Sequence, residues 1–122
     1  MQDVPLTVAA ILRYASTVHG DRTVTTATGD GYRHATYREV GKQAARLAHA
    51  LRRLGIEGDD RVATFMWNNQ EHLEAYVAVP SMGAVLHTLN IRLFPEQIEF
   101  VAYEAEDRGV ITPDVDALRT EF

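Results

Sequence analysis

Four polar side chains stand where two predicted strands end, and residues of these types could hold a ligand. Asn68 and Asn69 follow the apolar stretch that ends at Trp67, and Thr88 and Asn90 close the next apolar stretch. In an open parallel sheet the carboxyl ends of such strands share one edge, where ligands bind. However, asparagine before a helix is more often a cap, and asparagine in a loop is more often a turn residue. We therefore favour structural roles and assign no catalytic or cofactor-binding residue.

The histidines could serve as metal ligands or general bases, but their spacing favours neither role. They lie at positions 19, 34, 49, 72 and 87, and none forms an HxxxH or His–acid pair on one helix face. The sequence therefore predicts no metal site. We expect a structural or surface role for each, and only His87, inside an apolar strand, is a candidate for burial.

Recognisable catalytic and phosphate-binding motifs are missing from the sequence. Gly29 and Gly31 join two β-like runs, without the third glycine or the Gly-Lys-Ser/Thr ending of a phosphate loop. No Gly-x-Ser-x-Gly motif, pair of catalytic carboxylates or kinase-like set occurs. The chain has no cysteine, which excludes disulfides, thiolate metal sites and a catalytic thiol and is compatible with a reducing compartment.

Length and charge narrow the class of protein further. The 122 residues, 46% of them hydrophobic, fit one domain with a modest core. The formal net charge of -5 argues against a nucleic-acid partner, which needs clustered Lys and Arg. No basic leader with an apolar core is present, and no apolar run reaches the ~18 to 20 residues of a membrane span. We expect a soluble, cytoplasmic protein.

The second half of the sequence alternates strands and helices. It predicts a strand over 61–67, a helix over 70–82, an apolar strand within 83–94, a helix from Pro95 to near Asp107, and a short strand over 109–112. This alternation indicates a parallel α/β sheet. The first strand is apolar except for Arg61 and Thr64, so we place it at the centre of the sheet. The helix over 70–82 is apolar over most of its circumference, which predicts deep burial.

The first half predicts two helices and a hairpin. Thr7 can cap a helix over 8–18, and the β-rich runs 23–28 and 32–36 flank a Gly-Asp-Gly turn. Thr36 and Glu39 form a capping box for a helix over 37–54, which Gly55 should stop. The predicted fold is thus α/β: a β-hairpin plus a parallel βαβαβ sheet flanked by helices. The tail 113–122 lacks a clear partner and is expected to be disordered.

A basic stripe runs along one face of the helix over 37–54, opposite its leucines. Its members are Arg38, Lys42, Arg46, His49 and Arg53. Contact with an acidic lipid surface or another subunit is the functional interpretation, but no large aromatic residue interleaves to anchor the stripe in a bilayer. We favour a solvated helix face.

Several segments resemble fatty acyl-CoA synthetases of the adenylate-forming superfamily. Thr36-Tyr37, the alanine-rich helix up to Gly55, and Asp59 with RVA at 61–63 are similar to segments that identify the superfamily. More specific are WNN at 67–69, GAVLHTLN at 83–90, RLFPEQI at 92–98 and AEDR at 105–108, which look like the medium- and long-chain branch. Ile91 departs from the pattern, because many relatives place proline after the asparagine, and its absence would leave the loop less rigid.

The resemblance implies that residues 1–122 are the N-terminal subdomain of the AMP-binding domain of a longer enzyme. Such a parent would convert a fatty acid and ATP, with Mg, to an acyl-adenylate and pyrophosphate, and would then transfer the acyl group to CoA. The phosphate loop, the ribose-binding acid and the catalytic lysine of the family all lie beyond this region. The resemblance therefore implies no catalytic, cofactor-binding or metal residue here, and an inactive chain.

Two alternatives stay open. The parent could activate an aryl acid or an amino acid, or the chain could be a non-catalytic α/β dimerisation module. Because the sheet of a partial domain stops early, we also predict a homodimer or higher species. The expected contacts are a sheet edge, the apolar side of 8–18, or exchange of the terminal segment. Peripheral membrane contact stays an alternative because fatty acids partition into membranes.

Overall fold

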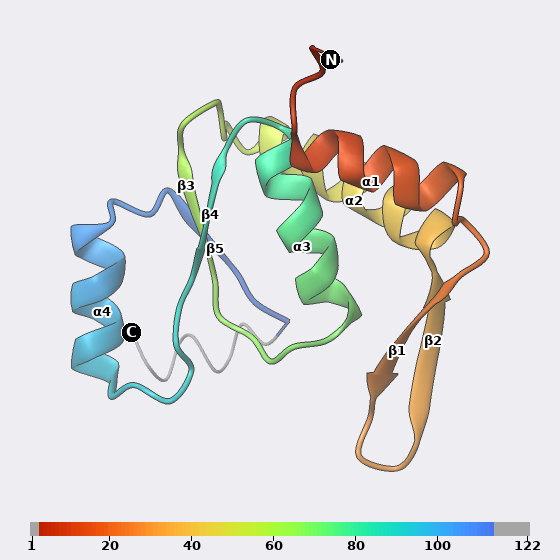
Figure 1. The fold of residues 1–122 in the computed structure, drawn as a ribbon. Helices are drawn as coiled ribbons and strands as arrows, with labels where there is room; N and C mark the ends of the chain where they lie inside the picture. Colours follow the sequence, from red (N-terminus) through yellow and green to blue (C-terminus); the bar gives the residue numbers. More distant parts are fainter. Residues whose placement is uncertain (1–2, 114–122) are drawn as a thin grey trace.

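A computed structural model describes residues 3–113, in which a helix and a hairpin precede alternating helices and strands (Figure 1). The elements are α1 (Val8–Thr17), β1 (Thr23–Ala27), β2 (Tyr32–Thr36), α2 (Tyr37–Arg53), β3 (Arg61–Thr64), α3 (Gln70–Ser81), β4 (Val85–Thr88), α4 (Pro95–Glu104) and β5 (Gly109–Ile111). The predicted α/β fold class, with a hairpin and a parallel sheet, is confirmed. The tail expected to be disordered lies, apart from Pro113, outside the described residues.

The parallel sheet has the order β4-β3-β5, with β3 in the predicted central place. Its strands are in parallel register, so that Val62 pairs with Leu86 on one side and with Gly109 on the other. Figure 1 shows α4 on one side of the sheet and α1, α2 and α3 on the other. Successive side chains of β3 must therefore enter two different cores.

Two apolar clusters follow from that alternation. Val62 is fully buried and packs with Leu51, Ile56, Val79 and Ala84 on the α2–α3 side. The next residue, Ala63, is equally inaccessible and packs with Leu89 and Ile98 on the α4 side. The short strand β3 thus joins both halves of the molecule.

Three expectations about these elements need correction. The strand predicted over 61–67 ends at Thr64, because β4 and β5 are only four and three residues long and the ladder stops with them. Trp67 is 67% exposed in the loop that follows. The fully buried residues of α3, among them Ala75 and Val79, lie on one face, whereas most of the helix is only partly buried and Tyr76 is 45% exposed. Leu54, predicted on the apolar stripe of α2, is exposed because the helix ends one residue earlier.

The local signals at the ends of α2 are confirmed. Thr36 Oγ1 accepts a hydrogen bond from the Glu39 amide at 3.2 Å, and Glu39 Oε2 accepts one from the Thr36 amide at 2.7 Å. The bond from the Thr36 amide, followed by one that the Thr36 hydroxyl donates to Glu39 Oε2 at 3.1 Å, lowers the pKa of Glu39. Gly55 takes the left-handed φ of 89° that ends the helix.

Thr36→Ala should lower the free energy of unfolding by about 1 kcal/mol, because it removes the side-chain acceptor at the start of α2 while leaving its apolar face intact. Denaturant titration measures the change. Thr17→Ala is a suitable control, since its hydroxyl donates to a carbonyl at the exposed end of α1. An unchanged unfolding midpoint for Thr36→Ala would show that the capping box contributes no stability.

Candidate functional site

The parallel register brings the four predicted edge residues to one end of the sheet, because Thr64 of β3 pairs with Thr88 of β4. Asn69 has the capping role that the sequence favours: its side chain accepts a hydrogen bond from the His72 amide at 2.8 Å. Asn90 is a turn residue, and its Oδ1 accepts from the Arg92 amide at 3.0 Å. Structural contacts thus occupy both of these amide side chains.

Asn68 and Thr88 differ from the other two edge residues. Their side chains are exposed, and within residues 3–113 neither makes a side-chain hydrogen bond. Of the four predicted edge residues, these two are available to bind a ligand. Both can donate and accept hydrogen bonds, so they could orient a polar ligand, but neither can act as a general base at neutral pH.

His72 is a buried residue at the same edge that the sequence does not single out. It is 6% exposed, and its Nε2 lies 2.9 Å from Oγ1 of Thr64. Its ring contacts that of Tyr76, with centroids 4.8 Å apart. Burial lowers the pKa of His72, and the Trp67 backbone opposes this only in part, so the imidazole is neutral at neutral pH.

The geometry of His72 limits what it can do chemically. Its Nδ1 is buried and has no hydrogen-bond partner within the described residues. A neutral imidazole beneath the surface can fix the side chain of Thr64, but it cannot reach a substrate at the exposed edge. One signal could have revealed its burial: His72 lies three and seven residues before Ala75 and Val79, which line the buried face of α3.

The β-hairpin is tied to the start of α3 beside this edge. Thr26 Oγ1 accepts a hydrogen bond from the Gln70 amide at 3.1 Å. Arg33 and Glu71 form a bidentate ion pair with both N···O distances at 2.7 Å. These contacts hold the hairpin against the helix that follows the β3 edge. The hydrogen bond from Arg33 lowers the pKa of Glu71, whereas burial raises the pKa of Glu74.

Glu71→Gln and Glu74→Gln should therefore change stability with opposite pH dependence. The lowered pKa of Glu71 gives stabilisation that is present above the ordinary glutamate pKa of about 4.3 and is lost as the pH falls through the lowered value. Glu71→Gln should destabilise at pH 7 by at most about 1 kcal/mol, because the pair is half exposed. The raised pKa of Glu74 means that its ionisation opposes folding as the pH rises. Glu74→Gln should stabilise at pH 7.

Urea titrations of the two variants and the wild type at about pH 3 and pH 7 test this pair. Both differences should shrink at the lower pH. Destabilisation by Glu71→Gln that is unchanged at low pH would show that the ion pair with Arg33 is not its source.

His87 forms a second buried contact between distant parts of the chain. Its Nδ1 lies 2.8 Å and 3.0 Å from the two carboxylate oxygens of Asp107. The Asp107 side chain is only 3% accessible, and that of His87 is 26% accessible. The expected partial burial of His87 is thus observed, and the contact ties β4 to the segment after α4.

The described residues offer no metal centre. No group of three His, Cys, Asp or Glu residues among them could hold a metal ion, and none of their helices is long and apolar enough to cross a bilayer. Hollows lie along the surface beside α1. One of about 460 Å³ lies beside α2 at Arg38 and Lys42, and one of about 410 Å³ lies between Ile11 and Val77 of α3. Neither is lined by the four edge residues.

Comparison with known proteins gives a consistent result. The model of the family described as "AMP-binding enzyme" matches residues 12–121. A long-chain-fatty-acid–CoA ligase from Thermus thermophilus is 42% identical, over 100% of this chain and 24% of its own length. A 3-methylmercaptopropionyl-CoA ligase from Ruegeria lacuscaerulensis is 37% identical, over 100% of this chain and 24% of its own length. The chain therefore spans about a quarter of the length of these curated relatives.

A solved structure supports the same relationship. The N-terminal domain of FACL13 from Mycobacterium tuberculosis superposes with a TM-score of 0.81 at 28% identity. The match covers 93% of this chain and 29% of that domain.

Proposed function

Since this chain belongs to the AMP-binding enzyme family, we propose that it forms the N-terminal subdomain, residues 1–122, of a fatty-acid–CoA ligase. The observation that carries the proposal is the 42% identity to a long-chain-fatty-acid–CoA ligase over the whole chain. The segments at 83–90 and 92–98, which contain β4 and the start of α4, also support it, because they resemble the medium- and long-chain branch.

The proposed reaction has two steps. A carboxylate oxygen of the fatty acid attacks the α-phosphorus of ATP, which forms an acyl-adenylate and releases pyrophosphate. The thiolate of CoA then attacks the acyl carbon, forms the thioester and expels AMP. The first step makes AMP the leaving group of the acyl carbon, in place of the carboxylate oxygen, which is a poor leaving group.

The described residues of this chain do not form a binding site for the Mg ion or the ATP phosphates that this reaction needs. No carboxylate cluster among the described residues could hold Mg, and the sequence contains no phosphate loop for ATP. We therefore assign no step to a residue of this chain. Its proposed contribution is a scaffold. Strands β3 and β4 form the carboxyl edge of the sheet, and the hairpin and α3 hold the loops beside that edge in position.

A second substrate has its own support. The 37% identity to a 3-methylmercaptopropionyl-CoA ligase, also over the whole chain, favours a short thioether-substituted carboxylic acid as the alternative to a fatty acid. Residues that line an acid pocket would discriminate the two, because a short polar-tailed acid and a long alkyl chain need pockets of different depth and polarity.

ATP–pyrophosphate exchange tests the proposal in two stages. The 122-residue chain should give no exchange above a blank with octanoate, palmitate or 3-methylmercaptopropionate, because exchange needs positioned cations and backbone donors. The product of the gene read beyond codon 122 should give fatty-acid-dependent exchange and contain a Ser/Thr/Gly-rich phosphate loop. Exchange by the short chain would overturn the scaffold role, and a longer product without such a loop or exchange would overturn the ligase.

A further inference from the structure

The two N-terminal helices carry a charge opposite to that of the rest of the chain. Together α1 and α2 contain six Lys or Arg residues and one acidic residue, Glu39. The chain as a whole has 12 basic residues and 17 acidic ones, so the sequence outside these helices is strongly acidic. Such an asymmetry creates complementary fields at different places on one molecule.

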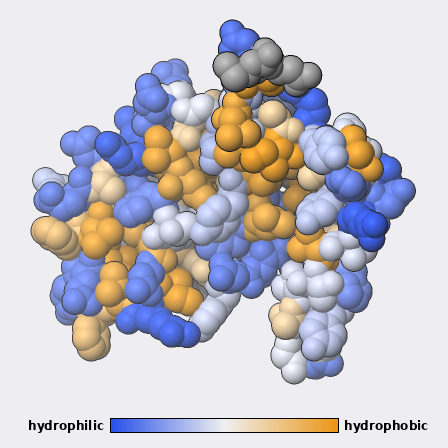
Figure 2. All heavy atoms as spheres, in the orientation of Figure 1, coloured by the Kyte–Doolittle hydropathy of each residue, from blue (hydrophilic) through white to orange (hydrophobic). Residues whose placement is uncertain are grey.

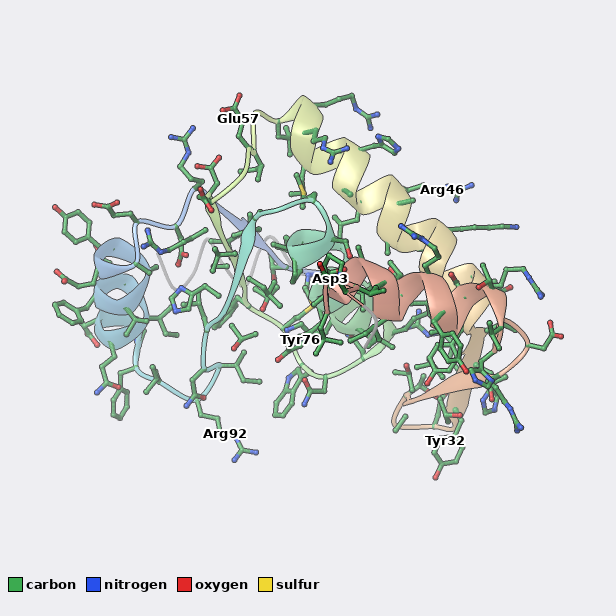
Figure 3. All side chains as sticks on the ribbon, turned by 45° about the horizontal axis from the view of Figure 1, so that its top comes forward. Asp3, Tyr32, Arg46, Glu57, Tyr76 and Arg92 are labelled. Atoms are coloured by element: carbon green, nitrogen blue, oxygen red, sulfur yellow. The ribbon has the colours of Figure 1, made fainter. Side chains whose placement is uncertain are left out.

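The basic stripe of α2 is fully available for contact. All five of its side chains are exposed, and they occupy an arc of about 80° on the helix over a length of about 22 Å. Only Arg38 is in an ion pair, with Asp21 at 2.7 Å. Lys42, His49 and Arg53 have no charged partner among residues 3–113. In Figure 3, Arg46 points away from the body of the molecule.

The outer face of α4 has the opposite character. Glu96, Glu99 and Glu104 are exposed there, and none of them forms an ion pair within the described chain. Between them Phe100 is 63% exposed and Tyr103 is 79% exposed. These five side chains share an arc of about 140°, opposite the buried Ile98. Carboxylates interleaved with aromatic rings suit a partner rich in arginine, through ion pairs and cation–π contacts.

The two faces cannot meet within one molecule. Figure 1 shows α4 on one side of the sheet, and α1 and α2 at the other end of the molecule. Figure 2, in the same orientation, shows apolar side chains exposed among polar ones over both regions. Contact between the faces therefore requires two copies of the chain.

We propose that the basic stripe of α2 docks on the face of α4 formed by Glu96, Glu99, Phe100, Tyr103 and Glu104 in a second copy. The contact is heterologous, so each dimer keeps one free stripe and one free α4 face, and larger species can follow at high concentration. It differs from the sheet-edge and terminal-exchange contacts predicted from the sequence. It also does not depend on ligase chemistry, so its test is separate from that of the proposed function.

The contact should be weak and sensitive to salt. The α4 face is about 12 Å long, so one helix covering another buries less than a stable interface of about 800 Å² per partner. Most of the attraction comes from charges at an exposed surface, which salt screens. We expect association that rises with protein concentration at about 0.01 M salt, where the Debye length is about 30 Å, and disappears at about 1 M, where it is about 3 Å.

Sedimentation velocity of charge-reversed variants tests the proposal. Glu99→Lys with Glu104→Lys reverses the net charge of the α4 face, and Lys42→Glu with Arg46→Glu removes the net charge of the stripe, in which Arg38 and Arg53 remain. Each double variant should lower the association constant at low salt at least about tenfold. Control pairs change net charge equally elsewhere: Asp3→Lys with Glu57→Lys, and Arg92→Glu with Arg108→Glu, all at exposed positions. The controls should associate like the wild type, and circular dichroism verifies that every variant is folded.

Mixing the two charge-reversed variants gives the sharpest result. Each variant alone has one intact and one altered face, whereas the mixture offers the intact stripe of one variant to the intact α4 face of the other. The mixture should regain association. A wild type that stays at 13.6 kDa at all concentrations, association that does not depend on salt, or a mixture that stays monomeric would overturn the proposal. Vesicles of phosphatidylserine and phosphatidylcholine test a membrane as the alternative partner of the stripe. If the stripe substitutions abolish vesicle binding but leave self-association unchanged, the proposal is also wrong.

Discussion

Val79→Asp should leave no cooperatively folded protein, which is the largest effect we expect from a single substitution. Val79 is inaccessible to solvent and packs against Leu51, Ile56 and Val62 in the larger core cluster. These neighbours are apolar and cannot pair with a carboxylate. An unpaired buried charge costs about 3–5 kcal/mol, which is much of the 5–15 kcal/mol by which domains are typically stable.

Val77→Asp provides the comparison on the same helix. The sequence predicts a severe effect for this variant too, because α3 looks apolar on most sides. In the structure Val77 is only partly buried and lines the hollow beside α1, where water can reach a carboxylate. Urea denaturation followed by circular dichroism should find Val77→Asp folded with reduced stability and Val79→Asp without a sigmoidal transition. Two equally stable variants would contradict the one-sided burial of α3.

Ile98→Ala should lower the free energy of unfolding by about 2–5 kcal/mol, which is the second largest effect. Ile98 is 1% exposed and is the α4 residue that fills the space over Ala63 and Leu89. Truncation removes buried methyl groups and leaves a cavity that a short helix and a three-stranded sheet cannot easily close. Since α4 contributes no other fully buried residue, the helix should detach before the rest of the chain unfolds.

Hydrogen exchange of the α4 amides measures that local opening, and urea titration measures the global change. Phe100→Ala is the matched control, because Phe100 lies two residues away in α4 with 63% of its surface exposed. It should change stability by less than about 0.5 kcal/mol. Equal effects of the two truncations would show that α4 is not held to the sheet through Ile98.

Local chemistry made much of the fold predictable from the sequence. The hydroxyl of Thr36 and the carboxylate of Glu39 bond to amides within one turn, so the start of α2 depends on nothing distant. Gly55 and Pro95 act through their own backbone torsions, as the left-handed turn after α2 and the first residue of α4. The stretch 61–67, apolar except for Arg61 and Thr64, indicated a central strand, because a strand covered on both faces has few polar positions.

Where each strand ends and which face of each helix is buried depend on residues that are distant in sequence. The strand after Arg61 stops at Thr64 because its neighbours stop, and the local pattern carries no information about their length. Gly41 lies inside α2, where glycine weakens a helix, but a Cβ there would lie 2.9 Å from Cβ of Ser16 in α1. The close approach of the two helices explains this residue.

At the candidate site, the polar residues that end the strands could be identified from their order in the chain, but which of them are free depends on how the elements pack. Asn69 and Asn90 bond to amides two or three residues away, so their structural roles could be inferred locally. The burial of His72 against Thr64 and the pairing of His87 with Asp107 could not, because each joins segments that meet only when the sheet and its helices pack. Sequence spacing fixes short-range hydrogen bonds, but burial and charge pairing between distant residues arise only from the packing of the complete fold.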